Sequence, residues 1–157
     1  MDVKISKKYL IYLFLLWIAP TICAIWGGPI WVTVSLLSFF AIYAGHEWIH
    51  VWVCKINNLD VETVFLSVGG KTHIVFEVPE EGPDKLRIEA DVYLAGVVWD
   101  SVWFTISILS SITYALFMQD QTPFTFGISL IVLLIFLLAW PGSDWQEFMK
   151  RIPKGVR

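Results

Sequence analysis

Charge is scarce in this sequence: 16% of its 157 residues are Asp, Glu, Lys or Arg, against about 25% in a typical soluble domain. Two cysteines, Cys23 and Cys54, are too few for the framework of a disulfide-stapled secreted module. The net charge of −3 offers no basic field to nucleic acid, so no nucleic-acid partner is expected. Apolar residues make up 57% of the chain and the mean hydropathy is +0.67, which is typical of a membrane protein.

Long apolar stretches define the expected membrane spans. No charged residue occurs between Tyr9 and Gly45, and a turn signal, Gly27-Gly28-Pro29, divides that stretch in two. A helix needs about 20 apolar residues to cross a bilayer. Largely apolar segments of about this length cover residues 9–26, 30–54, 90–118 and 124–141, the second with Glu47 and the third with Asp91 and Asp100 inside it. We therefore expect an all-α polytopic membrane protein of about four transmembrane helices, folded as one membrane-embedded domain over residues 1–157 in the lipid bilayer.

The polar loop at residues 55–89 is the sizeable hydrophilic segment of the chain. Two runs rich in β-branched and aromatic residues, Val61–Val68 and Thr72–Val78, flank Gly69 and Gly70. Such runs around a Gly-Gly pair are typical of a β-hairpin. The sequence predicts a small cytoplasmic β-hairpin between the second and third helices.

The basic residues fall before the first span, in the polar loop and after the fourth span. With four spans, these three places share one side of the membrane. The positive-inside rule then predicts a multi-pass protein with both termini in the cytoplasm. A cleaved signal peptide over residues 1–24 is the rival interpretation, but Pro20–Ala24 lacks the small-x-small pattern of a cleavage site.

The second span contains His46–His50, which fits the pattern HExxH. Residues four apart share one helix face, so two imidazoles can converge on one ion, and neutral imidazole is a good Zn²⁺ ligand. Glu47 projects beside that face, where it could act as general base toward a zinc-bound water. Ionisable groups within a membrane helix are costly, which favours a functional role over a packed polar cluster.

A catalytic zinc site takes three protein ligands and leaves one position open. Candidates for the third ligand are Asp100, Asp144, Glu147, His73 and Cys54. Asp144 is favoured because its depth matches that of His50 and because Pro141-Gly142 should break the fourth helix and free the backbone. The alternative role for Asp144 is to cap a short helix over Trp145–Ile152. We expect Glu147, on the same short helix, to face solvent.

These motifs together resemble the site-2 protease family of intramembrane zinc metalloproteases. Gly45–His50 matches the family's zinc-binding motif in a membrane helix. Leu94–Asp100 is similar to its Ala-Gly-Pro-x-x-Asn segment, and Pro141–Asp144 to its Asp-bearing motif. The Gly69-Gly70 pair matches the usual position of a Gly-Gly in the hairpin. The likeness covers residues 30–148.

The resemblance implies one Zn²⁺ per chain, bound by His46, His50 and Asp144, with Glu47 activating the water. The active site would lie toward the cytoplasm. The substrate would be a membrane-embedded peptide or protein, unwound and held by strand addition to the hairpin edge. Because the chain is short, its regulation would have to come from a membrane partner or from the supply of substrate.

Residues of the second and third motifs imply substrate contacts and also depart from the family. The resemblance gives Asp100, with Gly69 and Gly70, a role in holding the substrate or its oxyanion. Asp100 replaces the family's Asn, however, and Trp145 replaces a Gly after the zinc-binding Asp. An inactive pseudoprotease that serves as a membrane binding or assembly factor is therefore the alternative function. A metal or proton transporter is disfavoured, because a cluster on one side gives no path across the membrane.

Overall fold

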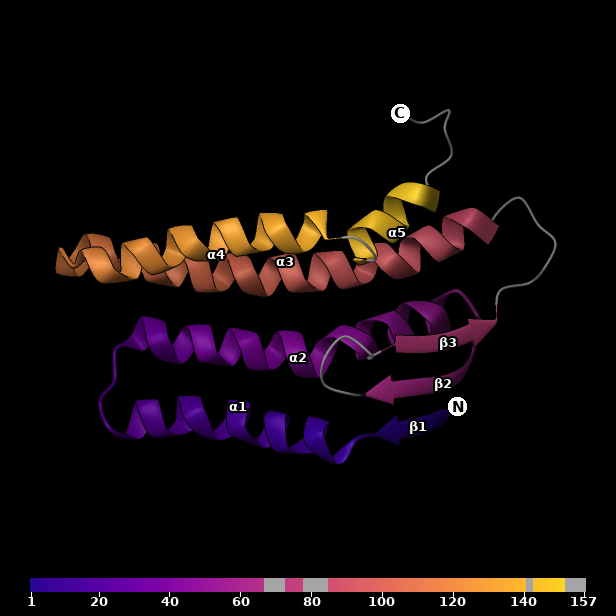
Figure 1. The fold of residues 1–157 in the computed structure, drawn as a ribbon, viewed down its shortest axis with the longest axis horizontal. Helices are drawn as coiled ribbons and strands as arrows, with labels where there is room; N and C mark the ends of the chain where they lie inside the picture. Colours follow the sequence, from indigo (N-terminus) through magenta and orange to yellow (C-terminus); the bar gives the residue numbers. More distant parts are fainter. Residues whose placement is uncertain (67–72, 78–84, 141–142, 152–157) are drawn as a thin grey trace.

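The computed structural model describes residues 1–66, 73–77, 85–140 and 143–151 (Figure 1). In chain order its elements are β1 (Asp2–Ile5), α1 (Lys7–Ile25), α2 (Ile30–Ile56), β2 (Asp60–Leu66), β3 (His73–Glu77), α3 (Lys85–Met118), α4 (Gln121–Ala139) and α5 (Asp144–Arg151). Within the described residues, α1 to α4 are long and apolar enough to cross a membrane. The prediction of four such helices is confirmed.

Helix boundaries differ from the predicted spans by a few residues at most ends. Residues 85–89 belong to α3 and not to the polar loop, so the loop was predicted too long. The first helix starts at Lys7 because Ser6 caps it, and the Ser6 hydroxyl accepts a hydrogen bond of 3.1 Å from the Tyr9 amide.

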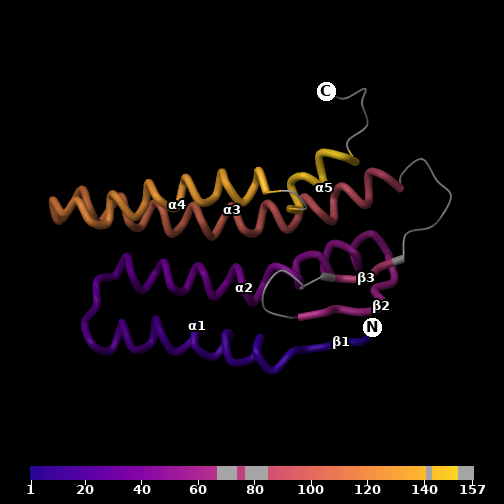
Figure 2. The backbone as a smooth tube through the Cα atoms, in the orientation of Figure 1, coloured from indigo at the N-terminus to yellow at the C-terminus, as the bar shows by residue number. Residues whose placement is uncertain are grey.

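The helices form two hairpins that lie side by side, α1 with α2 and α3 with α4 (Figures 1 and 2). The inner helices α2 and α3 pack against each other, while the sheet and α5 lie at the end away from the two hairpin turns. With 27 and 34 residues, α2 and α3 are about 40 and 50 Å long at 1.5 Å per residue, longer than the ~30 Å core of a bilayer. Their excess length projects toward the sheet.

A three-stranded sheet corrects the all-α expectation. Its order is β1-β2-β3, with β1 parallel to β2 and β3 antiparallel to β2. The predicted hairpin strands are confirmed in β2 and β3, whereas Gly69 and Gly70 lie outside the described residues. The prediction missed β1 because its four residues carry no turn signal and are paired only by the return of the chain through α1 and α2.

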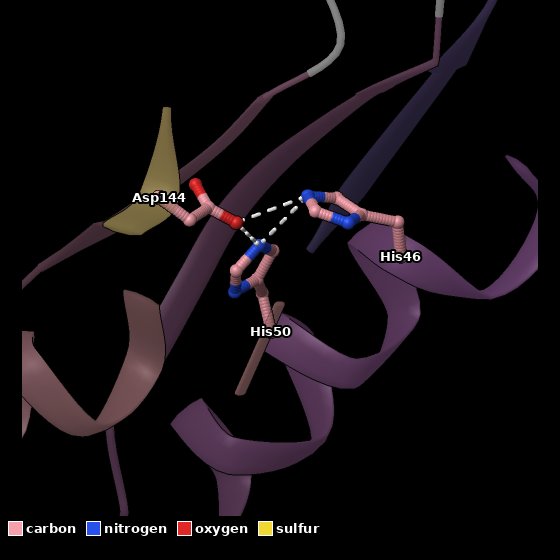
Figure 3. Close-up of side chains that lie close together, drawn as sticks. All are labelled: His46, His50 and Asp144. Carbon is pink, nitrogen blue, oxygen red and sulfur yellow. Dashed lines mark hydrogen bonds and ion pairs between the residues drawn. The ribbon is translucent and has the colours of Figure 1, made fainter. Parts of the chain in front are cut away.

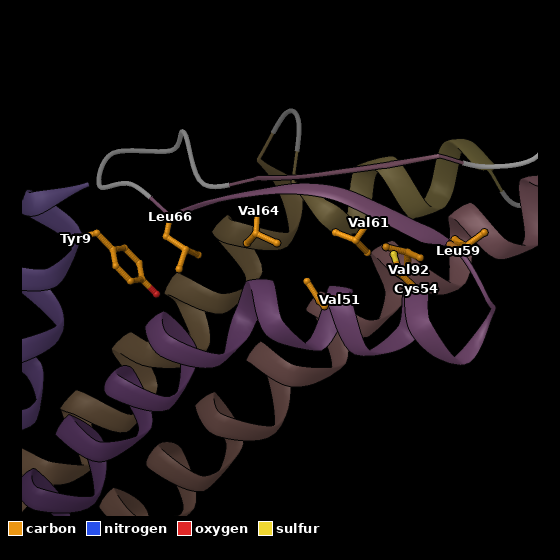
Figure 4. Packing of buried hydrophobic residues seen from close by; sticks show 8 residues of the cluster. All are labelled: Tyr9, Val51, Cys54, Leu59, Val61, Val64, Leu66 and Val92. Carbon is orange, nitrogen blue, oxygen red and sulfur yellow. The ribbon is translucent and has the colours of Figure 1, made fainter. Parts of the chain in front are cut away.

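A buried apolar cluster fastens the sheet to the second half of α2 (Figure 4). Its members are Tyr9, Val51, Cys54, Leu59, Val61, Val64, Leu66 and Val92. Cys54 and Val64 are fully buried, so Cys54 acts here as a small apolar side chain. Because Val51 and Cys54 follow His50 on α2, this cluster fixes the part of α2 that carries the HExxH motif.

Basic side chains of the described residues gather at the sheet end of the bundle. They lie in β1, at the start of α1, at the end of α2, at the start of α3 and in α5. The two turns at the opposite end, residues 26–29 and 119–120, contain no Lys or Arg. The one-sided distribution holds in three dimensions, and the membrane face to which it corresponds remains a prediction.

Candidate metal centre

His46 and His50 lie one turn apart on α2 and turn their Nε2 atoms toward Asp144, the first residue of α5 (Figure 3). Oδ2 of Asp144 lies 3.1 Å from Nε2 of His46 and 3.0 Å from Nε2 of His50. The two Nε2 atoms are 3.3 Å apart. The structure thus brings together the three residues that the sequence predicts as metal ligands.

The spacing of these three atoms fits a small divalent ion. With metal–ligand bonds of about 2.0–2.1 Å, two ligands of a tetrahedral zinc lie about 3.3 Å apart. The observed separations of 3.0, 3.1 and 3.3 Å are close to that value. His46, His50 and Asp144 could therefore hold a metal ion.

The outer nitrogens of both imidazoles are already paired. Nδ1–H of His46 donates to Oδ1 of Asp100 at 2.9 Å, and Nδ1–H of His50 donates to the Val92 carbonyl at 2.7 Å. In a neutral imidazole the proton then sits on Nδ1, and Nε2 presents a lone pair. Two lone pairs and a carboxylate oxygen converge on one point, an arrangement that calls for a cation.

Space for the ion depends on Gly96 of α3. A Cβ at this position would lie 2.5 Å from Cε1 and 2.7 Å from Nε2 of His50, and closer still to Oδ2 of Asp144. Those distances are far below ordinary van der Waals contact. The absence of a side chain at residue 96 leaves the ligand atoms unobstructed.

Asp144 is free to serve as a ligand because another residue caps α5. The hydroxyl of Ser143 accepts a hydrogen bond of 3.4 Å from the Gln146 amide, so the predicted alternative role of Asp144 as the cap falls to Ser143. The sequence carried this signal, since Ser143 and Gln146 have the spacing of a capping box.

The far end of α5 is tied to α3 by Arg151. Its guanidinium lies 2.8 Å from Glu89 of α3 and 2.6 Å from Glu147 of α5, and it stacks on the Tyr93 ring at 4.4 Å. Glu147 also pairs with Lys150. The expectation that Glu147 faces solvent is therefore wrong in part, because the ion pairs hold it against the helix. These contacts fix the direction from which Asp144 approaches α2.

Burial opposes ionisation of Asp144, whose side chain is 21% exposed. In the metal-free site, hydrogen bonds from protonated imidazoles of His46 and His50 outweigh that effect and hold the pKa of Asp144 well below its ordinary value. The carboxylate is therefore anionic at neutral pH, as a metal ligand must be.

Glu47 is buried on α2, beside His46 in the chain and about 100° around the helix from it. It is 7% exposed, an unusual position for a carboxyl group. The other candidate ligands lie apart from the three-residue group: Asp100 contacts the outer face of His46, and Cys54 lies in the apolar cluster. The side chain of His73 lies outside the described residues.

No protein-family model matches the chain, and neither a curated protein nor a solved structure matches it.

Proposed function

We propose that this chain is a zinc-dependent endopeptidase that hydrolyses peptide bonds of membrane-embedded substrates near the cytoplasmic face. The observation that carries the proposal is the convergence of His46, His50 and Asp144 at one end of a bundle of apolar helices. Histidine nitrogen with one carboxylate oxygen is a donor set of catalytic zinc sites, and three ligands leave a coordination position open.

When bound, zinc would polarise the scissile carbonyl and lower the pKa of water. Glu47, buried beside His46, would take the proton of the attacking water and pass it to the leaving amine nitrogen. The carboxylate is suited to this task because it lies in the same helix as two of the ligands, so its position relative to them is fixed.

A cavity of about 390 Å³ beside β3 could receive part of the unwound substrate. It is lined by Ile74, Val75, Phe76, Lys85, Glu89, Tyr93 and Arg151. Tyr93 precedes Gly96 by one helical turn and Arg151 follows Asp144 by two turns, so two lining residues belong to the helices that form the metal centre. The described sheet ends at β3, which leaves a strand edge where an extended peptide could add by main-chain hydrogen bonds.

The topology follows from the charges. Basic residues lie at the sheet end, so the positive-inside rule assigns that end and the metal centre to the cytoplasm. Asp144 comes five residues after the end of α4, so in a bilayer the site would lie near the edge of the hydrocarbon layer. A substrate would then be cut close to that face.

The test compares the parent chain with Glu47→Gln and with the control Glu62→Gln, which alters an exposed carboxylate of β2. Each is purified for zinc analysis and co-expressed with a panel of tagged single-span membrane peptides. We expect about one zinc per chain in all three and cleavage by the parent and the control alone. Cleavage by Glu47→Gln would refute the proposed general base. A parent that binds zinc but cuts none of the peptides, or that binds no zinc, would favour the non-catalytic binding factor.

A further inference from the structure

Asp100 lies in the interior of α3, where a carboxylate inside an apolar helix is costly without a partner. Its partner is His46, whose Nδ1 is 2.9 Å from Oδ1 of Asp100. The two side chains are 28% and 26% exposed, so the pair is only partly open to solvent. Asp100 thus contacts Nδ1 of His46, on the edge of the imidazole that points away from the metal centre.

We propose that Asp100 is a positioning residue that fixes the tautomer and the ring orientation of His46 for metal binding. This inference rests on the zinc site of the proposed function. A carboxylate that accepts the outer N–H of a metal-binding imidazole keeps the proton on Nδ1, leaves the lone pair on Nε2 and raises the basicity of the ligand. Every one of these effects strengthens the bond from His46 to the ion.

The charge of the carboxylate gives a second reason for an Asp at this position. A divalent ion in a weakly polar environment is stabilised by every nearby negative charge. Asp100, separated from the ion by one imidazole ring, adds its charge to those of Asp144 and the proposed base Glu47. An Asn at residue 100, the residue of the family pattern, would accept the same hydrogen bond without that charge.

The neighbouring contacts hold Asp100 in place. Nε1–H of Trp99 donates to the Ala41 carbonyl at 3.0 Å, across the α2–α3 interface. The Trp99 ring lies directly over Gly45, where a Cβ would be 2.7 Å from Cε2 and 2.8 Å from Nε1 of the indole. Because Gly45 precedes His46 and Trp99 precedes Asp100, this packing sets the register in which the carboxylate faces the imidazole.

The partners of the two imidazoles also differ in a way that makes the inference testable. His50 donates to the main-chain carbonyl of Val92, which no side-chain substitution removes. His46 donates to a side chain, so a change at Asp100 removes its partner while the three ligands remain. A substitution at Asp100 therefore separates orientation from ligation.

The experiment measures zinc affinity of the purified full-length chain by competition with a chromophoric chelator, for the parent, Asp100→Ala and Asp100→Asn. Asp91→Asn is the matched control, an exposed aspartate nine residues earlier on α3. We expect Asp100→Ala to bind zinc about 10- to 100-fold more weakly, which is the usual effect of removing the hydrogen-bond partner of a metal-binding imidazole. Asp100→Asn should keep part of the affinity through its amide oxygen, and Asp91→Asn all of it.

Cobalt substitution gives a second readout that a general loss of stability would not move. The visible absorption of bound Co²⁺ reports ligand geometry, so we expect it to change in Asp100→Ala and to stay unchanged in Asp91→Asn. Parent-like zinc affinity and cobalt spectra in both Asp100 variants would overturn the positioning role while leaving the metal site intact. A parent chain that binds no metal, or that keeps its zinc after His46→Ala, would instead refute the proposed function.

Discussion

Gly96→Ala should abolish tight zinc binding while adding only one methyl group. The new Cβ would lie 2.5–2.7 Å from ring atoms of His50 and even nearer to the Asp144 carboxylate. Ordinary contacts of carbon begin near 3.5 Å, so at least one ligand must retreat by about 0.8 Å. Metal–ligand distances tolerate only about 0.2 Å, so that ligand would be lost.

The expected loss of zinc affinity follows from the contribution of one ligand to the binding free energy of a zinc site. Structural zinc sites with four ligands bind with about 10–16 kcal/mol, or about 2.5–4 kcal/mol per ligand. At about 1.4 kcal/mol per factor of ten, Gly96→Ala should weaken zinc binding roughly 60- to 700-fold. Without metal the His50 and Asp144 side chains can rotate away, and Ala favours a helix over Gly by about 1 kcal/mol. Stability of the metal-free chain should therefore change little.

Chelator competition on detergent-purified protein measures the zinc affinity, and thermal unfolding in EDTA measures the stability of the metal-free chain. Gly127→Ala in α4 is the matched control, because the nearest atom to its Cβ would be Cγ1 of the Ile112 side chain at 3.2 Å, and its other contacts, at 3.7 Å, are of ordinary length. If Gly96→Ala binds zinc as tightly as the parent and Gly127→Ala, then the ion does not occupy the space beside residue 96, and the proposed centre is wrong.

Two further predictions concern α5 and pH. Arg151→Met keeps an apolar stem but removes the contacts with Glu89, Glu147 and Tyr93, each worth up to about 1 kcal/mol. Zinc affinity should fall about 3- to 10-fold in the same competition assay, and less than about 2-fold for the control Lys150→Met. Equal losses in the two variants would argue against a role of Arg151 in holding α5 in place. Zinc affinity should also fall as the pH is lowered from about 7 to 5, by up to about 100-fold per unit, because protons compete with the ion for the two imidazole nitrogens, while Asp144, with its lowered pKa, stays ionised. A flat zinc affinity between about pH 7 and 5 would contradict imidazole ligation.

Local sequence patterns were sufficient to predict the helices and those parts of the site that depend on the periodicity of a single helix. A largely apolar run of adequate length predicts a span, and two histidines four residues apart predict a shared face, so α1 to α4 and the pair His46 and His50 follow from the sequence. Asp144 could be chosen as the third metal ligand because the positions of the basic residues indicate that it lies at a depth in the membrane similar to that of His50. The break before it is confirmed, since α4 ends at Ala139 and α5 begins at Asp144.

Features that depend on how separate elements pack were not accessible in the same way. The contact of Asp100 with His46 requires the register between α2 and α3, which Trp99 and Gly45 set through packing. The pairing of β1 with β2 joins residues about 60 apart through two helices, and four residues with no turn signal give no hint of it. Sequence reasoning finds the ligands here more readily than the groups that orient them.

The parallel pairing of β1 with β2 also constrains how the chain is threaded into a bilayer. Residues 2–5 meet residues 63–66 only if α1 and α2 cross in opposite directions and return the chain to its starting side. A chain with either helix misinserted would place β1 on the far side, leave the edge of β2 unpaired and remove Tyr9 of α1 from the apolar cluster beneath β2. Because that cluster also contains Val51 and Cys54, which follow His50 on α2, the HExxH segment would be fully packed only in correctly threaded molecules. If the chain is inserted in a bilayer as proposed, the sheet would couple assembly of the candidate metal centre to insertion, and a misthreaded chain would bind metal weakly.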